Sequence, residues 1–240
     1  TGDLEQMKAE VAKFSPKDLP GYLLFLEEAE NCYKLAFEDL GAVAFDSIGD
    51  LVKAMPNLIK MRAWNNLYSL VAKYIKNPQL REVMSFHPLL IGGNPFSVSS
   101  AYALINSLER KWGVYSAMGG TGAIIKGLVK LLDGLGVSIR YASTVKKINI
   151  VDNKVTGVTL ENGDILYANK VVSNADTAWT YKNLIDPEYR KVWTDKKIEK
   201  GKYSMSLFVW YFGTKKQYPQ VPHHMMLLGK RYKELLDDIF

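Results

Sequence analysis

Two pairs of turn-forming residues constrain the fold of this chain more than any other feature of its sequence. Asp152-Asn153 and Asn162-Gly163 interrupt a run in which apolar and polar residues alternate. Such pairs favour the tight turns that join antiparallel strands. The stretches that they separate are Val145–Val151, Lys154–Glu161 and Ile165–Val172. The pattern predicts a three-stranded antiparallel meander.

A second pattern precedes the meander and begins after Trp112. A glycine turn, Gly119-Gly120-Thr121-Gly122, is followed by an amphipathic stretch from Ala123 to Leu135. Short apolar stretches, Val114–Ser116 and Val137–Tyr141, flank these two features. A strand, a helix and a strand in this order predict a right-handed βαβ unit.

Before Trp112 the spacing of the apolar residues is helical. Ser15 followed by Pro16 is typical of a helix start, because proline at the first helical position removes no intrahelical hydrogen bond. Pro56 is expected to break a helix, since its ring removes a backbone donor. The expected helices run from Ser15 towards Leu40, from Ser47 to Pro56, from Pro56 towards Ile75, from Pro78 to Phe86 and from Ser97 to Trp112.

The residues after the meander predict one more helix and one more pair of strands. Asn174-Ala175-Asp176 offers an N-cap for the helix. Tyr203–Phe212 is strongly apolar and is expected to form a strand that pairs with Met225–Leu228. The predicted fold class is therefore mixed α/β (α+β), with a helical lobe and a lobe that contains the βαβ unit and the meander.

The composition supports a folded protein and excludes two classes of function. Hydrophobic residues make up 48% of the 240 residues, enough for a packed core. The net charge is +6, but lysine and arginine are scattered without a dense block, so we expect no nucleic-acid binding. One cysteine and three histidines, without the spacing of zinc ligands, lead us to expect no metal site.

Two stretches bear on membranes. The longest uncharged run, Val83–Leu108, is interrupted by proline and glycine, whereas a spanning helix needs about 20 predominantly apolar residues. We therefore expect no spanning helix. The expected helix from Pro56 to Ile75 is apolar on two faces and has basic residues beside them. Such a helix is either enclosed by protein or has one face against lipid.

The glycine turn is the first candidate for a binding site. Backbone N–H groups at the start of a helix favour a polar or anionic group. No Gly-Lys-Ser/Thr follows, so the turn is not a P-loop, and Ile125 occupies the position of the last small residue in the dinucleotide fingerprint. Two interpretations stay open, a ligand contact and a plain strand-to-helix turn.

Only weak candidates for acid–base chemistry occur. His87 lies in the uncharged run Phe86–Phe96, where it is either a base or a hydrogen-bonded core residue. The run itself suits either the wall of a hydrocarbon cavity or a buried connection. Asp50 stands one helical turn before Lys53, as in an ordinary surface pair. No hydrolase motif accompanies them, so we expect a cofactor to perform any chemistry.

Taken in order, several segments resemble the bacterial-type phytoene desaturases, which are FAD-dependent carotenoid desaturases. The resemblance covers essentially the whole chain, and its most specific part is the combination of Gly92–Phe96 with Gly119–Ala123. The segments that carry it are Ser85–Phe96, Ser99–Ile105, Leu108–Val114, Gly119–Ala123, Val172–Asp176 and Ser206–Gly213.

The resemblance implies a two-lobed, amine-oxidase-like fold. Residues 1–112 would form a substrate-binding and membrane-associated lobe, residues 113–180 part of the FAD-binding lobe, and residues 181–240 a return to the substrate lobe. The opening Gly-x-Gly-x-x-Gly turn of the family does not occur here. We therefore expect the chain to be an internal piece that by itself binds FAD weakly or not at all.

The resemblance also implies contacts for individual residues. The backbone at Val145 would touch the adenine end of FAD. Asp50 matches the acidic member of a polar pair near the substrate, whereas Lys53 stands where the family has arginine. The residues expected near the isoalloxazine ring and the substrate are Gly119, Gly120 and Thr121.

The implied function is desaturation of phytoene or a related long apolar polyene. Hydride would pass to the flavin, and the delocalised allylic cation would lose a proton without a strong base. Two alternatives stay open: a carotenoid isomerase or saturase of the same fold, and a non-catalytic isoprenoid-binding protein. The resemblance implies a cytoplasmic protein attached peripherally to a membrane, and it does not specify the oligomeric state.

Overall fold

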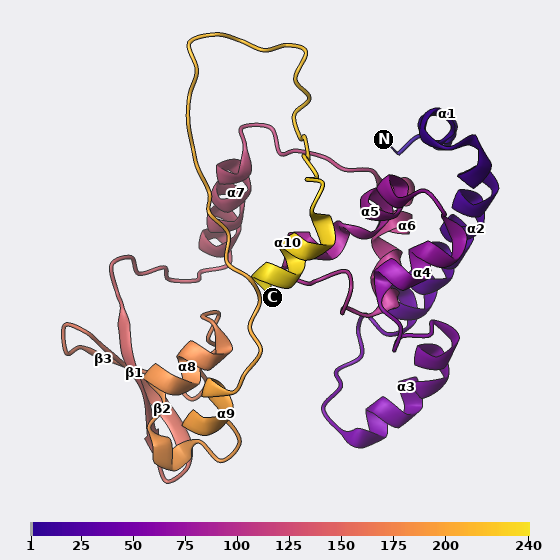
Figure 1. Ribbon diagram of the computed structural model, residues 1–240. Helices are drawn as coiled ribbons and strands as arrows, with labels where there is room; N and C mark the ends of the chain where they lie inside the picture. The colour runs from indigo at the N-terminus through magenta and orange to yellow at the C-terminus, as the bar shows by residue number, and fades with distance from the viewer. Residues whose placement is uncertain (1) are drawn as a thin grey trace. The chain divides into compact units, whose positions relative to one another are not determined.

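The computed structural model describes residues 2–240, which divide into two compact units (Figure 1). The helical unit contains the described residues up to Tyr115 together with Ser204–Phe240, and the sheet unit contains Ser116–Tyr203. Many helices and one three-stranded antiparallel sheet confirm the predicted mixed α/β class. The roles predicted for residues 1–112, 113–180 and 181–240 stay a prediction.

The helical unit is built from short helices joined by tight turns. Its helices are α1 (Leu4–Phe14), α2 (Leu19–Tyr33), α3 (Ile48–Lys60), α4 (Leu67–Tyr74), α5 (Pro78–Ser85), α6 (Leu104–Trp112) and α10 (Tyr232–Ile239). Shorter helical turns cover Pro16–Asp18, Lys34–Asp39, His87–Ile91 and Ser100–Ala103. Three predicted helices are confirmed: the one from Ser15 towards Leu40, the one from Pro78 to Phe86 and the one from Ser97 to Trp112.

Local caps explain where these helices begin. The side chain of Asn66 accepts a hydrogen bond from the Ser69 N–H at 2.7 Å, and Asn77 does the same for α5. Helix α1 was not predicted, although its signal is present. Asp3 caps it by accepting from the N–H of Gln6 at 2.8 Å, as in a capping box.

The expected break at Pro56 is wrong, because α3 runs through this proline. A proline inside a helix removes one hydrogen bond, and here the exposed α3 tolerates that loss. The chain instead leaves the helix at residues 61–66, where Arg62 has a φ of 51°. The single helix expected from Pro56 to Ile75, with two apolar faces, is therefore two separate helices.

The core of the helical unit lies between α2 and α4. Both helices direct their apolar faces inward, and α5 and the turns around them close the cluster. Its fully buried members include Val11, Tyr22, Phe25, Ala29, Cys32, Met61, Leu67, Leu70, Val71, Ile75, Leu80, Met84 and Ala103.

One polar junction holds this core together at the start of α2. The buried carboxylate of Asp18 accepts hydrogen bonds from the backbone N–H groups of Lys76 and Asn77, both at 2.8 Å. Gly21, one turn later, lies so close to α4 that a Cβ atom there would stand 2.0 Å from the Tyr74 carbonyl oxygen. The two features bring α2 and the end of α4 into direct backbone contact.

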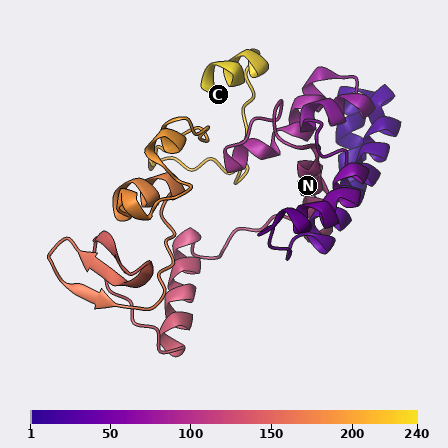
Figure 2. The same cartoon turned by 90° about the horizontal axis from the view of Figure 1, so that it is seen from below.

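The sheet unit contains the predicted meander (Figure 2). Its strands are β1 (Val145–Val151), β2 (Lys154–Leu160) and β3 (Ile165–Tyr167), and its helices are α7 (Thr121–Gly134), α8 (Thr177–Leu184) and α9 (Asp195–Glu199). Asp152 and Asn153 have φ values of 50° and 59°, as a two-residue hairpin turn of this hand requires. The meander and both of its turns are confirmed, but β3 pairs with β2 only as far as Tyr167, whereas the expected strand continued to Val172.

Helix α8 packs on β1 and gives the sheet unit its small core. Asp176 caps this helix by accepting from the Trp179 N–H at 2.8 Å, as its sequence predicted. Ile148 from β1 and Leu184 from α8 are both buried. Lys147 and Asp186 form an ion pair at 2.5 Å beside them.

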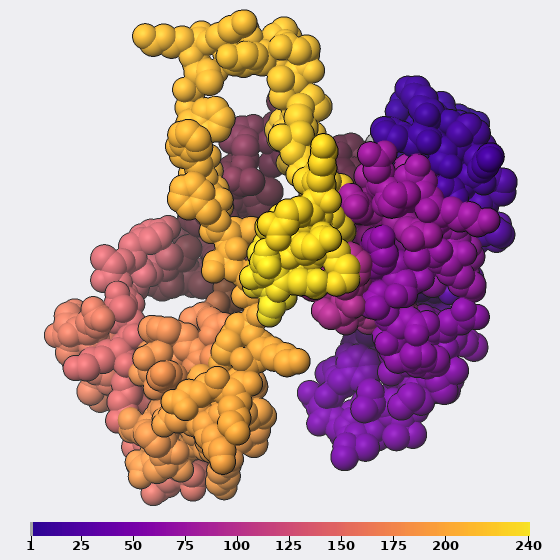
Figure 3. All heavy atoms as spheres, in the orientation of Figure 1, coloured from indigo at the N-terminus to yellow at the C-terminus, as the bar shows by residue number. Residues whose placement is uncertain are grey.

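The remaining predicted strands are not formed in the part of the chain that the structure describes. Helix α7 confirms the helix expected between Val114–Ser116 and Val137–Tyr141, but neither stretch is a strand. Tyr203–Phe212 and Met225–Leu228 likewise have no strand pairing. Figure 3 shows the chain around Tyr203–Phe212, in orange, as a single extended strip. A strand forms only where a neighbour supplies hydrogen-bond partners, and sequence alone does not reveal whether the neighbour is there.

Replacing Asp18 tests the junction between α2 and α4. Hydrogen bonds to a charged acceptor contribute about 1.5–3 kcal/mol each, so Asp18→Ala lowers the free energy of unfolding by about 3 kcal/mol. Asp46, an exposed loop residue, is the matched control, and Asp46→Ala changes the same free energy by less than about 0.5 kcal/mol. Urea unfolding followed by circular dichroism measures both, and equal effects would contradict the account.

The same junction has a defined pH dependence. Burial raises the pKa of Asp18, but the N–H groups of Lys76 and Asn77 lower it more, and the pKa lies below its ordinary value of 3.8. The carboxylate therefore stabilises the fold fully above pH 3.8 and loses this effect as the pH falls through the lowered pKa. The difference in unfolding free energy between wild type and Asp18→Asn shrinks only in that acidic range.

Candidate functional site

The uncharged run Phe86–Phe96 forms a partly buried turn in the helical unit, in which His87, Pro88, Asn94 and Pro95 are buried and Leu90 and Ile91 are exposed. Its helical turn, His87–Ile91, ends at Gly92 with a φ of 74°, a conformation that favours glycine. The side chain of buried Asn94 then accepts from the Phe96 N–H at 2.9 Å. Backbone groups in this run bond to one another, so its apolar side chains can serve as a fixed wall.

Hydrogen bonds attach the residues that follow this run to the turn between α3 and α4. The hydroxyl of Ser99 donates to the Ala63 carbonyl at 2.7 Å. The fully buried hydroxyl of Ser100 lies 3.1 Å from the Met61 carbonyl oxygen and 3.0 Å from that of Arg62. The wall is therefore fixed to the same core that Asp18 holds together.

His87 is buried in this wall and has a carboxylate partner. Its Nε2 lies 3.2 Å from Oε2 of Glu109 in α6, and its ring stacks on Phe86 at 4.4 Å. Burial raises the pKa of Glu109, but the hydrogen bond and charge of His87 lower it more, and Arg110 adds to the lowering. This pair can hold a proton between its members. The pairing of Glu109 with His87 was not predicted, because the two residues stand 22 positions apart and no motif joins them.

The structure places Asp50 in a capping box at the start of α3. Its Oδ2 accepts from the backbone N–H of Ser47 at 3.1 Å and from the Ser47 hydroxyl at 2.7 Å. Within residues 2–240 there is no ion pair between Asp50 and Lys53, so the surface pair expected from their spacing is not formed. The Asp50 carboxylate therefore caps helix α3, and its predicted role near the substrate stays a prediction.

The glycine turn forms the start of α7 in the sheet unit. Gly119 and Gly120 have φ values of 85° and 77°, which only glycine adopts without strain. Thr121 is the first residue of α7, and no side chain caps this end of the helix. The first turn of α7 is exposed, so a polar or anionic group can approach its N–H groups.

Val145 lines a hollow on the meander. It is the first residue of β1 and pairs with Leu160. The hollow has a volume of 550 Å³ and is lined by Val145, Leu160, Ser138, Arg140, Ser143, Ile165, Leu166 and Tyr167. Arg140 and the Ser138 hydroxyl give it hydrogen-bond donors beside apolar walls, whereas the Ser143 hydroxyl already donates to the Tyr141 carbonyl at 2.9 Å. Such a hollow can take a ligand that combines an apolar ring with polar atoms.

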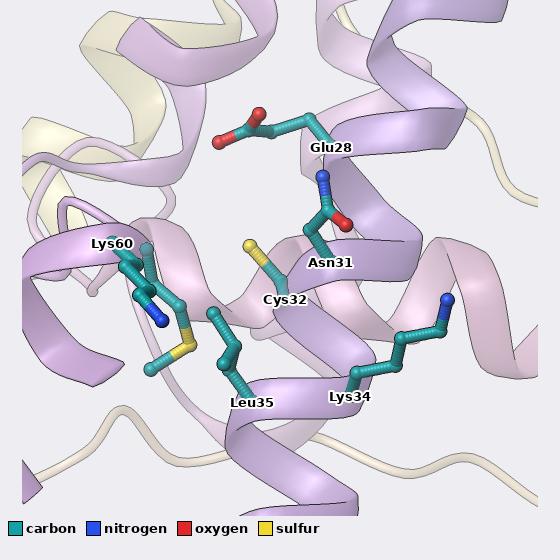
Figure 4. A pocket seen from close by; sticks show the side chains of 7 residues that line it. Glu28, Asn31, Cys32, Lys34, Leu35 and Lys60 are labelled. Carbon is teal, nitrogen blue, oxygen red and sulfur yellow. The ribbon is translucent and has the colours of Figure 1, made fainter. Parts of the chain in front are cut away.

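A separate cavity of 310 Å³ lies in the helical unit between α2 and the end of α3 (Figure 4). Figure 4 shows Cys32 and Leu35 extending toward Lys60, whereas Lys34 extends to the other side of α2. Burial, with a contribution from Glu28, raises the pKa of the Cys32 thiol to about 12. The thiol is therefore neutral and unreactive near pH 7, and this cavity contains none of the predicted site residues.

The described residues also bear on metal sites and membrane spans. Among residues 2–240, no group of three or more His, Cys, Asp or Glu side chains could hold a metal ion. Within the same residues, no helix is long and apolar enough to cross a membrane.

Comparison with known proteins identifies the family. The family model described as "Flavin containing amine oxidoreductase" matches residues 61–235. A neurosporene-forming phytoene desaturase of Cereibacter sphaeroides is 44% identical over 98% of this chain and 46% of its own length. A lycopene-forming phytoene desaturase of Pantoea ananas is 41% identical over 99% of this chain and 48% of its own length.

A more distant relative extends the same pattern. A zeta-carotene-forming phytoene desaturase of Myxococcus xanthus is 30% identical over 100% of this chain and 46% of its own length. The chain thus spans about half the length of the curated relatives that it matches. The predicted resemblance to the phytoene desaturases is confirmed, and the chain belongs to the flavin containing amine oxidoreductase family.

Proposed function

We propose that the whole protein is an FAD-dependent desaturase that introduces double bonds into phytoene or a related carotenoid precursor. One observation carries the proposal: the chain is 40–44% identical to curated phytoene desaturases over at least 98% of its length.

The residues of the sheet unit fit parts of FAD. The hollow at Val145 would take the adenine end, with Arg140 and the Ser138 hydroxyl as its polar contacts. Gly119, Gly120 and Thr121 would lie near the isoalloxazine ring and the substrate. Glycine at the first two positions allows the positive φ values that this turn requires.

The helical unit would supply the wall for an apolar substrate. The run Phe86–Phe96 has no charged residue, and its glycines and Asn94 fix its shape. A polyene has no polar group to recognise, so its site needs apolar walls that exclude water. Because such a substrate dissolves in lipid, the whole protein would attach peripherally to a membrane on its cytoplasmic side.

The reaction removes two hydrogens from a saturated carbon pair between double bonds. When bound, FAD accepts one of them as a hydride. The adjacent carbon then loses a proton, and the two electrons of that C–H bond form the new double bond. Because the cation is allylic and delocalised, loss of the proton does not require a strong base.

Substitution of the two candidate bases tests this mechanism. Loss of a general base costs about 10²–10⁴-fold in rate, so His87→Ala and Asp50→Asn should each keep more than about a hundredth of the wild-type desaturation rate. FAD content and melting temperature, measured on the same samples, separate a lost base from a lost fold. A correctly folded, flavin-loaded variant with a larger loss would identify a base that the mechanism does not include.

The proposed function is tested with the whole protein and phytoene-loaded liposomes, with and without FAD. We expect desaturated, coloured carotenes only in the presence of FAD, identified by their absorption spectra and masses. Desaturated products in a flavin-free sample would contradict the proposal. Products with the mass of phytoene would indicate an isomerase, and products two hydrogens heavier would indicate a saturase.

A further inference from the structure

Helix α3 has an apolar stripe that does not face the core of its own unit. At 100° per residue, Ile48, Leu51, Val52, Met55 and Ile59 fall within one 100° sector of the helix. The side chains that α3 directs to the core, Ala54 and Leu58, lie beside this sector. The stripe is therefore a second apolar face of the helix.

This stripe is open to solvent. Ile48 is 82% exposed, Val52 62% and Ile59 53%, and Leu51 and Met55 are also exposed. Single exposed apolar residues are common on protein surfaces, whereas a continuous row marks an interaction surface. Two large exposed aromatic residues flank α3 in the sequence, Phe45 before it and Trp64 after it.

The charges around the stripe favour an anionic partner. Lys53 and Lys60 lie on one side of α3, and Arg62 follows its end; all three are exposed and have no ion pair within residues 2–240. The nearest carboxylate on α3, that of Asp50, is occupied by Ser47 in the capping box. The cations therefore remain available to an external partner.

We infer that the α3 stripe docks onto the surface of an anionic lipid bilayer. An amphipathic helix with an aliphatic face, basic residues on its polar side and a tryptophan shortly after its end is suited to lie in the plane of the lipid interface. The inference rests on the proposed function in one respect: a lipid-soluble substrate is the reason for the protein to bind a membrane. The docking surface lies on α3. The sequence analysis had instead considered a lipid-facing helix over Pro56–Ile75, and no such single helix is formed.

Vesicle flotation with the whole, FAD-loaded protein tests this surface. The vesicles contain phosphatidylcholine with or without phosphatidylglycerol. Val52→Glu should weaken binding to anionic vesicles about tenfold or more, because it removes apolar contact and adds a charge opposed to the headgroups. Val192 is the matched control, since it is 63% exposed but lies outside α3; Val192→Glu should change binding by less than about twofold.

A charge variant tests the basic residues separately. Each lysine near an anionic surface contributes about 1 kcal/mol, so Lys60→Gln should weaken binding about fivefold on anionic vesicles and not on neutral ones. Lys170→Gln, at an exposed lysine in the sheet unit, should have no such effect. Equal losses in Lys60→Gln and Lys170→Gln would overturn the assignment to α3.

Other results would also overturn the inference. Unchanged vesicle binding in Val52→Glu would exclude the stripe as the membrane contact. If that variant no longer forms a dimer, the stripe contacts a second copy of the protein. If its melting temperature falls instead, the stripe packs against another part of the same protein. Conversion of phytoene in detergent micelles separates the two proposals. A protein that binds vesicles through the stripe but makes no carotene supports the docking surface and contradicts the desaturase.

Discussion

The carboxylate of Asp18 is the interaction on which the helical unit depends. It joins the start of α2 to the backbone between α4 and α5, two segments that are 58 positions apart in the sequence. The close approach at Gly21 then lets the apolar faces of α2 and α4 form one core. Ser99 and Ser100, which follow the run Phe86–Phe96, attach it to that core. The position of the apolar wall therefore depends on the polar junction at Asp18.

Local chemistry was sufficient to predict much of the fold. Pro78 marked the start of α5, and Asp152-Asn153 marked a hairpin turn, because each depends only on neighbouring residues. Pro56 was misinterpreted, since an exposed helix tolerates one lost hydrogen bond. The strands expected at Val137–Tyr141 and Tyr203–Phe212 depend on partners elsewhere, which no local pattern reveals.

In the candidate site too, features set by neighbouring residues were predicted and features set by distant residues were missed. The glycine turn was found from its composition, and the positive φ values of Gly119 and Gly120 explain why glycine stands there. Glu109 was missed because its pairing with His87 arises from the packing of α6 against the run Phe86–Phe96. What the described residues offer is apolar walls, backbone N–H groups and one weakly basic pair. This set suits a reaction in which a flavin takes the electrons and the protein excludes water.

In the proposed reaction, electrons from the polyene pass to FAD. An anaerobic titration of the whole, FAD-loaded protein with phytoene in vesicles, followed by the visible absorbance of the flavin, measures this transfer. We expect the oxidised flavin spectrum to disappear in step with the new double bonds, since without oxygen each double bond reduces one flavin. Desaturated carotene formed while the flavin remains oxidised would contradict it.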